Sequence, residues 1–298
     1  MAQTTYTANG KLLISGEYLV MKGANAFALP TKLGQQMTVD LAPGEQGLFW
    51  RSSDPSGVWF EASFDIPGLN VRGSNNPEIA KTLQNLLATA IQLNPDFRFP
   101  NETVFVETHL GFDRFWGLGS SSSLVYLISQ WIGCDPFALN RIIFQGSGYD
   151  IACAMSHEPL VYRLLDRSPQ WSAVPFNPPF SNHLWLVYLN RKQNSLSELR
   201  LIQAEFDYSS EIARLDEITS QIIHSGGIDQ FITLIDQHEA IIGSVIRRQP
   251  VKQSLFGDFN GTVKSLGAWG GDFVLVASLW PEDKTEDYFI QKGYNSIF

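Results

Sequence analysis

The chain has 298 residues, of which 44% are hydrophobic and 17% are charged, a composition that favours a folded protein with a large core over a disordered one. It carries 21 Lys and Arg against 30 Asp and Glu, a formal net charge of −9. This balance argues against nucleic acid or an anionic membrane as a partner, because both need a basic surface. Two cysteines, with neither a secretory leader nor a long apolar run, predict a cytoplasmic protein.

The first 65 residues are predicted to form strands joined by turns, and helices follow them. Strands are expected over 11–14, 36–41, 48–52, 58–64 and 102–107, with a hairpin turn at 54–57. Asn76 and Pro77 begin a helix that keeps one apolar face through Ile91. Further helices are predicted over 120–132, where Gly133 ends the apolar pattern, and over 136–144.

A cluster of prolines at 169–179 suggests a boundary between two domains, 1–172 and 173–298. Beyond it, the pattern predicts a strand over 184–189 and amphipathic helices within 196–224 and 228–246. Strands over 263–266 and 273–279 and a terminal helix complete the chain. Strands and helices mix without strict alternation, which indicates an α+β protein in two lobes.

The segment Gly117-Leu118-Gly119-Ser120-Ser121-Ser122-Ser123 leads directly into a predicted helix. Glycines allow a tight turn and a close ligand approach, while the first N–H groups of the helix and its dipole favour an anion. The segment matches neither the Walker A pattern nor the dinucleotide fingerprint. A phosphate-binding loop and an ordinary serine-capped helix both remain possible from spacing alone.

Two more glycine-rich segments contain a carboxylate. Residues 146–152 (GSGYDIA) place Asp150 at the predicted start of a short helix, where it could act as a catalytic group or only cap the helix. Residues 267–272 (GAWGGD) lie between two predicted strands and alone would indicate a tight turn.

Three segments, taken in order, resemble the motifs of the small-molecule kinase superfamily that contains galactokinase, homoserine kinase, mevalonate kinase and phosphomevalonate kinase. They are residues 10–20 (GKLLISGEYLV), 117–123 (GLGSSSS) and 264–272 (KSLGAWGGD). The mevalonate-pathway branch is the most similar, since residues 146–152 and Asp272 resemble phosphomevalonate kinases. The resemblance implies an N-terminal lobe like ribosomal protein S5 domain 2 and a ferredoxin-like C-terminal lobe.

The resemblance also implies roles for single residues. Asp150 matches the catalytic aspartate and Lys11 the lysine beside the transferring phosphate. The loop Gly117–Ser123 would bind ATP, and Ser121 would ligate Mg²⁺. The implied partner is a small acidic acceptor, with mevalonate or phosphomevalonate as first candidates. The implied substrate-binding positions are Glu17, Tyr18, Ser147, Gly148, Ser195, Gly267, Ala268, Gly270 and Gly271.

The sequence departs from the superfamily at three places. Leu139 stands where mevalonate kinases have a metal-binding glutamate, and Trp269 stands where the third motif has glycine. The stretch 109–116 is unusually aromatic, so its rings either stack on adenine or pack in the core. Two alternatives stay open. One is a lyase of the same fold that resembles mevalonate diphosphate decarboxylase, and the other, favoured by Leu139 and Trp269, is a relative that binds nucleotide or metabolite without turnover.

Overall fold

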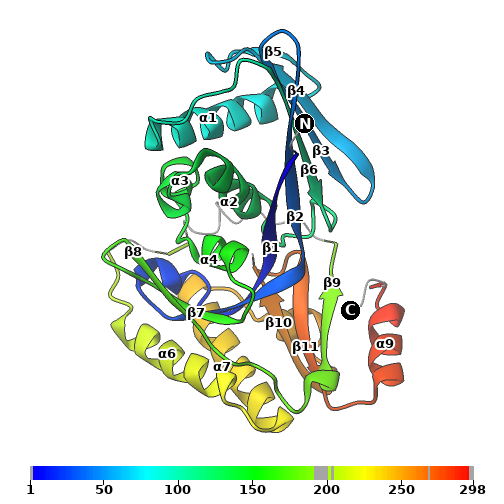
Figure 1. Ribbon diagram of the computed structural model, residues 1–298. Helices are drawn as coiled ribbons and strands as arrows, with labels where there is room; N and C mark the ends of the chain where they lie inside the picture. The colour runs from blue at the N-terminus through cyan, green and yellow to red at the C-terminus, as the bar shows by residue number, and fades with distance from the viewer. Residues whose placement is uncertain (1–2, 191–200, 203–204, 268, 295–298) are drawn as a thin grey trace. The chain divides into compact units, whose positions relative to one another are not determined.

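The computed structural model describes residues 3–190, 201–202, 205–267 and 269–294 (Figure 1). The chain forms two compact units. The first consists of Met1–Lys11, Pro30–Arg114 and Leu118–His157, and the second of Leu12–Leu29, Phe115–Gly117 and Glu158–Phe298. Two strands, β1 (Thr4–Ser15) and β2 (Ala26–Ala42), pass from one unit into the other.

The sheet of the first unit has the strand order β5-β4-β3-β6-β2, and β1 pairs with β2. Strand β3 (Gly47–Asp54) forms an antiparallel hairpin with β4 (Gly57–Phe64) and lies parallel to β6 (Thr103–Leu110). The short β5 (Val71–Ser74) pairs with β4 at the edge. Buried and exposed residues alternate along β3 and β6, as expected for a sheet with one face packed on a core.

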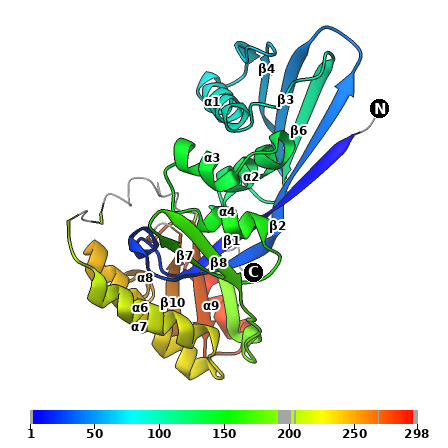
Figure 2. The same cartoon turned by 60° about the vertical axis from the view of Figure 1, so that its left-hand side comes forward.

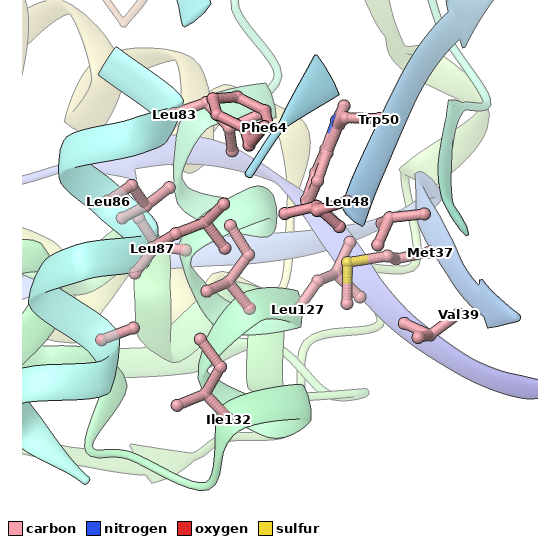
Figure 3. Close-up of a cluster of buried hydrophobic side chains, with 14 of the residues drawn as sticks. Met37, Val39, Leu48, Trp50, Phe64, Leu83, Leu86, Leu87, Leu127 and Ile132 are labelled. Atoms are coloured by element: carbon pink, nitrogen blue, oxygen red, sulfur yellow. The ribbon is translucent and has the colours of Figure 1, made fainter. Parts of the chain in front are cut away.

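Four helices belong to this unit: α1 (Pro77–Leu93), α2 (Ser120–Ile132), α3 (Pro136–Ile143) and α4 (Tyr149–Met155). Asn76 caps α1 and Asp135 caps α3 through side-chain oxygens that accept backbone N–H groups. One face of the sheet packs against α1 and α2 to form the core (Figure 3). The core side chains include Met37, Leu48, Trp50, Phe64, Leu83, Leu86, Leu87 and Leu127.

The second unit contains an antiparallel sheet of order β10-β11-β9, built from β9 (Leu184–Tyr188), β10 (Gly261–Leu266) and β11 (Phe273–Ser278). Helices α6 (Ser209–Ile223) and α7 (Ile228–Ile246) lie side by side, and α7 packs against β10 (Figures 1 and 2). Two shorter helices, α8 (Val251–Leu255) and α9 (Glu282–Gln291), complete this core.

The second unit also holds a hairpin of β7 (Leu160–Leu165) and β8 (Ser168–Ala173), in which β7 pairs with Ala26–Ala28 of β2. Two 3₁₀ turns, η1 (Leu19–Lys22) and η2 (Ser181–His183), lie in the same unit. Strands β7 and β8 cluster with the C-terminal residues, in the stretch of the second unit that begins at Glu158. The domains 1–172 and 173–298 stay a prediction.

The α+β class is confirmed. The predicted elements overlap observed ones in the same order, except that residues 196–200 lie outside the described residues and that β5, β7, β8 and α8 were not predicted. The predicted helix over 120–132 coincides with α2, and the hairpin of β3 and β4 forms where it was expected. Strand β8 was missed because Pro169 counts against a strand, yet it lies at the sheet edge, where a missing N–H is tolerated. Within the described ranges, no helix is both long and apolar enough to cross a bilayer.

Shortening the buried Leu87 to alanine tests the core of the first unit. Leu87 is fully buried on α1, whereas Leu93 on the same helix is 36% exposed. Leu87→Ala removes core contacts and leaves a cavity, so we expect a loss of about 2–5 kcal/mol in the free energy of unfolding. Urea denaturation measures it, with Leu93→Ala as the matched control. Equal losses for the two variants would contradict this packing.

Candidate active site

The residues just before α2 contact strand β1 through a hydrogen bond and close packing. Gly119 precedes the helix with a left-handed φ of 93°, and the Lys11 N–H donates to the Leu118 carbonyl at 2.9 Å. A Cβ on Gly119 would lie 2.9 Å from Cγ of Lys11. Glycine is therefore required here by conformation and by space together. The result is that the Lys11 side chain passes directly over the start of the helix.

The start of α2 has no side-chain cap, unlike α1 and α3, since its cap residue is Gly119. The first N–H groups of a helix have no acceptor inside the helix, and the dipole adds partial positive charge there. With the ammonium group of Lys11 alongside, this end of α2 is suited to bind an anion.

The last three serines of the loop differ in exposure and in hydrogen-bond partners. Ser122 and Ser123 are buried: Ser122 donates a hydrogen bond to Oδ2 of Asp150, and Ser123 donates to Oε1 of Gln35 at 2.6 Å. Ser121 is exposed. The structure thus leaves the Ser121 hydroxyl available to a ligand, and the role of this residue in metal binding stays a prediction.

Asp150 is the second residue of α4, and Gly148 is the cap residue of that helix. Besides the bond from Ser122, its Oδ1 accepts the Ile151 N–H at 3.1 Å. Both Asp150 and Lys11 are partly exposed. They are not joined by a direct ion pair, but the Lys11 Nζ lies 5.8 Å from the centroid of the adjacent Tyr149 ring.

The thiol of Cys153, which lies on α4 with Asp150, is buried. Its pKa is raised, first by burial and then by the charge of Asp150, while Lys11 acts in the opposite direction. Lys11 and Asp150 both lie at the start of α2, because the Lys11 side chain packs against Gly119 and the Ser122 hydroxyl donates to Asp150. Ser147 and Gly148 directly precede α4, the helix that holds Asp150.

Leu139, which replaces the family's glutamate, is fully buried in the core of the first unit. Its side chain contributes packing and has no oxygen for a metal. Among the residues that the structure describes, no group of three or more His, Cys, Asp or Glu is arranged to hold a metal ion.

The third glycine segment lies in the second unit, between β10 and β11. Trp269 is 6% exposed, its Nε1 donates to the Gln249 carbonyl at 2.9 Å, and its N–H donates to the Tyr18 hydroxyl at 3.1 Å. The indole is thus packed inside the unit and not laid over an open turn. Gly117 approaches this segment too, because a Cβ on it would overlap the Asp272 carboxylate.

Most of the aromatic side chains of residues 109–116 pack against other parts of the protein. Phe112 is buried, and the Trp116 ring lies 5.5 Å from the Phe273 ring and 6.1 Å from the Tyr188 ring. Phe115 is exposed. Two predicted substrate positions, Ser195 and Ala268, lie outside the described residues.

Glu17 has a different setting from the one expected of a substrate ligand. It is 4% exposed and bound to the ammonium group of Lys264, close to His238 and Glu239. Sequence analysis did not single out His238 or Glu239. The available signal was the spacing of Phe231, Leu234, Ile235 and Ile242 along α7, which places His238 on the apolar face of the helix.

Comparisons with known proteins support a kinase-like fold. Neither a protein-family model nor a curated protein sequence matches the chain. Among solved structures, phosphomevalonate kinase of Streptococcus pneumoniae, in complex with phosphomevalonate and AMPPNP, has a TM-score of 0.71 at 16% identity, covering 100% of this chain and 99% of that one. Mevalonate kinase of L. major, in complex with R-mevalonate, has a TM-score of 0.70 at 15% identity, covering 99% and 94%.

Galactokinase of Lactococcus lactis, complexed with galactose, has a TM-score of 0.65 at 13% identity and covers 99% of this chain and 92% of that chain. The similarity therefore extends over the whole chain in each comparison. This chain therefore has the fold of these three kinases, in agreement with the resemblance that the three glycine-rich motifs indicate.

Proposed function

We propose that this protein is an ATP-dependent kinase that phosphorylates a small acidic metabolite. The observation that supports this function best is the convergence of Lys11, the first turn of α2 and Asp150, which Ser122 links to that turn. Phosphoryl transfer requires mainly positioning and the neutralisation of negative charge, and this arrangement offers both.

The loop from Gly117 to Ser123 would hold the polyphosphate of ATP. The uncapped N–H groups at the start of α2 and the positive end of its dipole are suited to phosphate oxygens. Lys11 adds a full positive charge at the same place, where it would stabilise the charge that develops on the transferring group.

Asp150 would accept or orient the proton of an acceptor hydroxyl. The hydrogen bond from Ser122 fixes the direction of the carboxylate, so one oxygen is held while the group stays partly exposed. If the acceptor is a phosphate, as in phosphomevalonate, less base catalysis is needed, and Lys11 would matter more than Asp150.

The residues present fit a simple magnesium site. Mg²⁺ retains several waters and needs few protein ligands when nucleotide phosphates are present. The exposed Ser121 hydroxyl would be one ligand, and Leu139 contributes none. When bound, Mg²⁺ supplies neutralisation of phosphate charge.

The acceptor is proposed to be mevalonate or phosphomevalonate. The two kinases quoted above, whose structures contain these molecules, match the chain over nearly its full length. Substrate-binding roles for Ser147, Gly148, Gly267, Gly270 and Gly271 belong to the same proposal. Tyr18 would contribute through its contact with Trp269.

Removal of either charged side chain should abolish most turnover. We expect Asp150→Asn to lower kcat with a hydroxyl acceptor by about 10²–10⁴-fold, as for loss of a general base. Lys11→Met should lower kcat by about 10²–10³-fold through loss of charge stabilisation. Coupled assay of ADP release with each acceptor measures both effects.

Controls for this assay are Asp96→Asn and Lys81→Met, which change the same residue types at exposed positions of the first unit. Near-normal turnover of Lys11→Met would refute the assignment of the site. Release of CO₂ from mevalonate diphosphate, measured in parallel, would instead identify the decarboxylase alternative. ATP binding without consumption in the presence of any acceptor would identify a non-catalytic relative.

A methyl group at Gly119 tests the phosphate-binding loop. Gly119→Ala combines a strained left-handed φ with a clash against Lys11, so we expect the Kd for ATP to rise by about 10-fold or more. Gly226→Ala is the matched control, because a Cβ there meets nothing within 4 Å. Isothermal titration with a non-hydrolysable ATP analogue measures both. Unchanged binding by Gly119→Ala would show that this loop does not contact the nucleotide.

A further inference from the structure

Four ionisable side chains meet in the interior of the second unit, and we refer to them as the buried quartet. Glu17 follows β1, His238 and Glu239 are neighbours on α7, and Lys264 lies on β10. None of the four is more than 4% exposed. Charged groups at this depth are costly unless each one is paired.

Lys264 is the centre of the buried quartet. Its Nζ binds Oε1 of Glu17, lies 3.4 Å from Oε1 of Glu239, and donates to the Ser265 carbonyl at 2.9 Å. His238 extends the group on the other side: its Nε2 lies 3.1 Å from Oε2 of Glu17, and its Nδ1 lies 3.7 Å from Oε1 of Glu239. The imidazole is therefore placed between two carboxylates.

The protonation of Nε2 decides which contacts around His238 are favourable. The Gly16 N–H also points at this atom, at 3.1 Å, and would need it to accept a hydrogen bond. A neutral ring that accepts from Gly16 turns a lone pair toward Oε2 of Glu17. A doubly protonated ring instead donates to Glu17 and turns its second N–H toward Glu239.

The unsatisfied atoms favour the doubly protonated ring. Oε2 of Glu17, Nδ1 of His238 and Oε1 of Glu239 are buried and have no hydrogen-bond partner of good geometry among the described residues. In an imidazolium both ring nitrogens carry a hydrogen, so Nε2 faces Oε2 of Glu17 and Nδ1 faces Oε1 of Glu239 with opposite charge. The Gly16 N–H then loses Nε2 as its acceptor. The imidazolium also balances the charges, since two carboxylates then face one ammonium and one imidazolium.

The pKa directions agree with this assignment. Burial alone would lower the pKa of His238, but the adjacent Glu17 carboxylate raises it above the ordinary 6.5. Burial likewise opposes ionisation of Glu17, yet the charges of Lys264 and His238 lower its pKa to about 2. The titratable groups that face His238 are Glu17 from the turn after β1, Glu239 from its own helix and Lys264 from β10.

The buried quartet is bonded to the third glycine segment. The Ser265 N–H donates to Oε2 of Glu239 at 3.4 Å, and the Ser265 hydroxyl in turn accepts the Gly270 N–H at 3.1 Å. On the other side Glu17 is followed by Tyr18, whose hydroxyl accepts the Trp269 N–H. The turn that contains Gly270 is thus held from both sides by residues in or next to the quartet.

We propose that His238 is a positively charged positioning residue, whose imidazolium balances the buried quartet and thereby fixes the turn that contains Gly270. The charge state and its effect on stability stand independently of the proposed function. The consequence for substrate binding rests on that function, because Gly270 and Gly271 are proposed to contact substrate.

Nuclear magnetic resonance of the histidine rings tests the charge state without any need for activity. In protein labelled with ¹⁵N-histidine, we expect one of the five rings to remain an imidazolium above pH 6.5, where an unperturbed histidine loses its proton. Its signal should disappear in His238→Gln. If that variant does not fold, single substitutions of the other four histidines identify the signal by elimination. A neutral His238 ring at pH 6.5 would overturn the proposal.

A double-mutant cycle tests the charge balance. With an imidazolium present, Glu239→Gln leaves the quartet with one excess positive charge, so we expect a lower Tm. His238→Gln should lower it too, while the double variant again leaves one carboxylate facing one ammonium and should lose less than the sum. Additive losses, or a Tm raised by Glu239→Gln alone, would contradict the balance.

The pH dependence of the free energy of unfolding gives a further test of the positive charge on His238. Because the pKa of His238 is raised on folding, its contribution to stability is complete below 6.5 and is lost as the pH rises through the folded value. This loss should be absent in His238→Gln. Thr219→Val is the matched control: it removes the buried, uncharged contact of Thr219 with Ser15 at 2.8 Å and should keep the wild-type pH dependence. A wild-type profile in His238→Gln would refute the assignment.

In the kinase assay, Glu239→Gln should raise KM for the acceptor more than it lowers kcat, since the turn is displaced while Lys11 and Asp150 stay in place. Equal KM values for Glu239→Gln and wild type would remove the positioning role even if the imidazolium is observed. If no acceptor is turned over by the wild type, the proposed function fails while the resonance and stability tests still decide the charge state.

Discussion

The arrangement of the candidate active site depends on the close approach of β1 to the first turn of α2. The Lys11 N–H is bonded to the Leu118 carbonyl, and the missing Cβ of Gly119 leaves room for the Lys11 side chain. Any larger residue at position 119 would have to displace either the helix start or the lysine. One backbone contact thus fixes where the positive charge lies relative to the unpaired N–H groups of the helix.

A second link, from Ser122 to Asp150, brings α4 to the same place. Together the two contacts connect segments that are distant in the sequence, and each uses a small or short polar residue. This explains why a serine-rich helix start is compatible with a stable core. Ser122 and Ser123 satisfy internal partners, while Ser121 stays on the surface.

Much of the fold could be predicted from the sequence, because glycines, prolines and helix-capping residues mark the ends of the elements. Gly119 and Gly133 set the limits of α2, and Asn76 with Pro77 begins α1. The placement of β7 and β8 could not be predicted in this way. Their unit is decided by pairing with β2 more than a hundred residues earlier, and local patterns contain no information on that pairing.

The candidate site shows the same division. The loop at 117–123 and Asp150 have local signals, and the structure brings them together. The buried quartet could not be recognised as a group, because Glu17, the two residues of α7 and Lys264 come from three separate places in the chain. The spacing within α7 alone suggests an ordinary core position for His238. Glu17 is expected to bind substrate from its position in the first motif, and the structure places it in the interior beside Lys264 and His238. Its role in substrate binding stays a prediction.

The two cysteines have a practical consequence for following this protein in solution. Cys153 is buried, whereas Cys134 is partly exposed and lies just beyond the C-terminal end of α2. Burial raises the pKa of both thiols, so alkylation will be slow and will favour the accessible one. A fluorophore on Cys134 would sit about 20 Å along the helix axis from the glycine loop. It would be close enough to report on that helix and too far away to obstruct the loop.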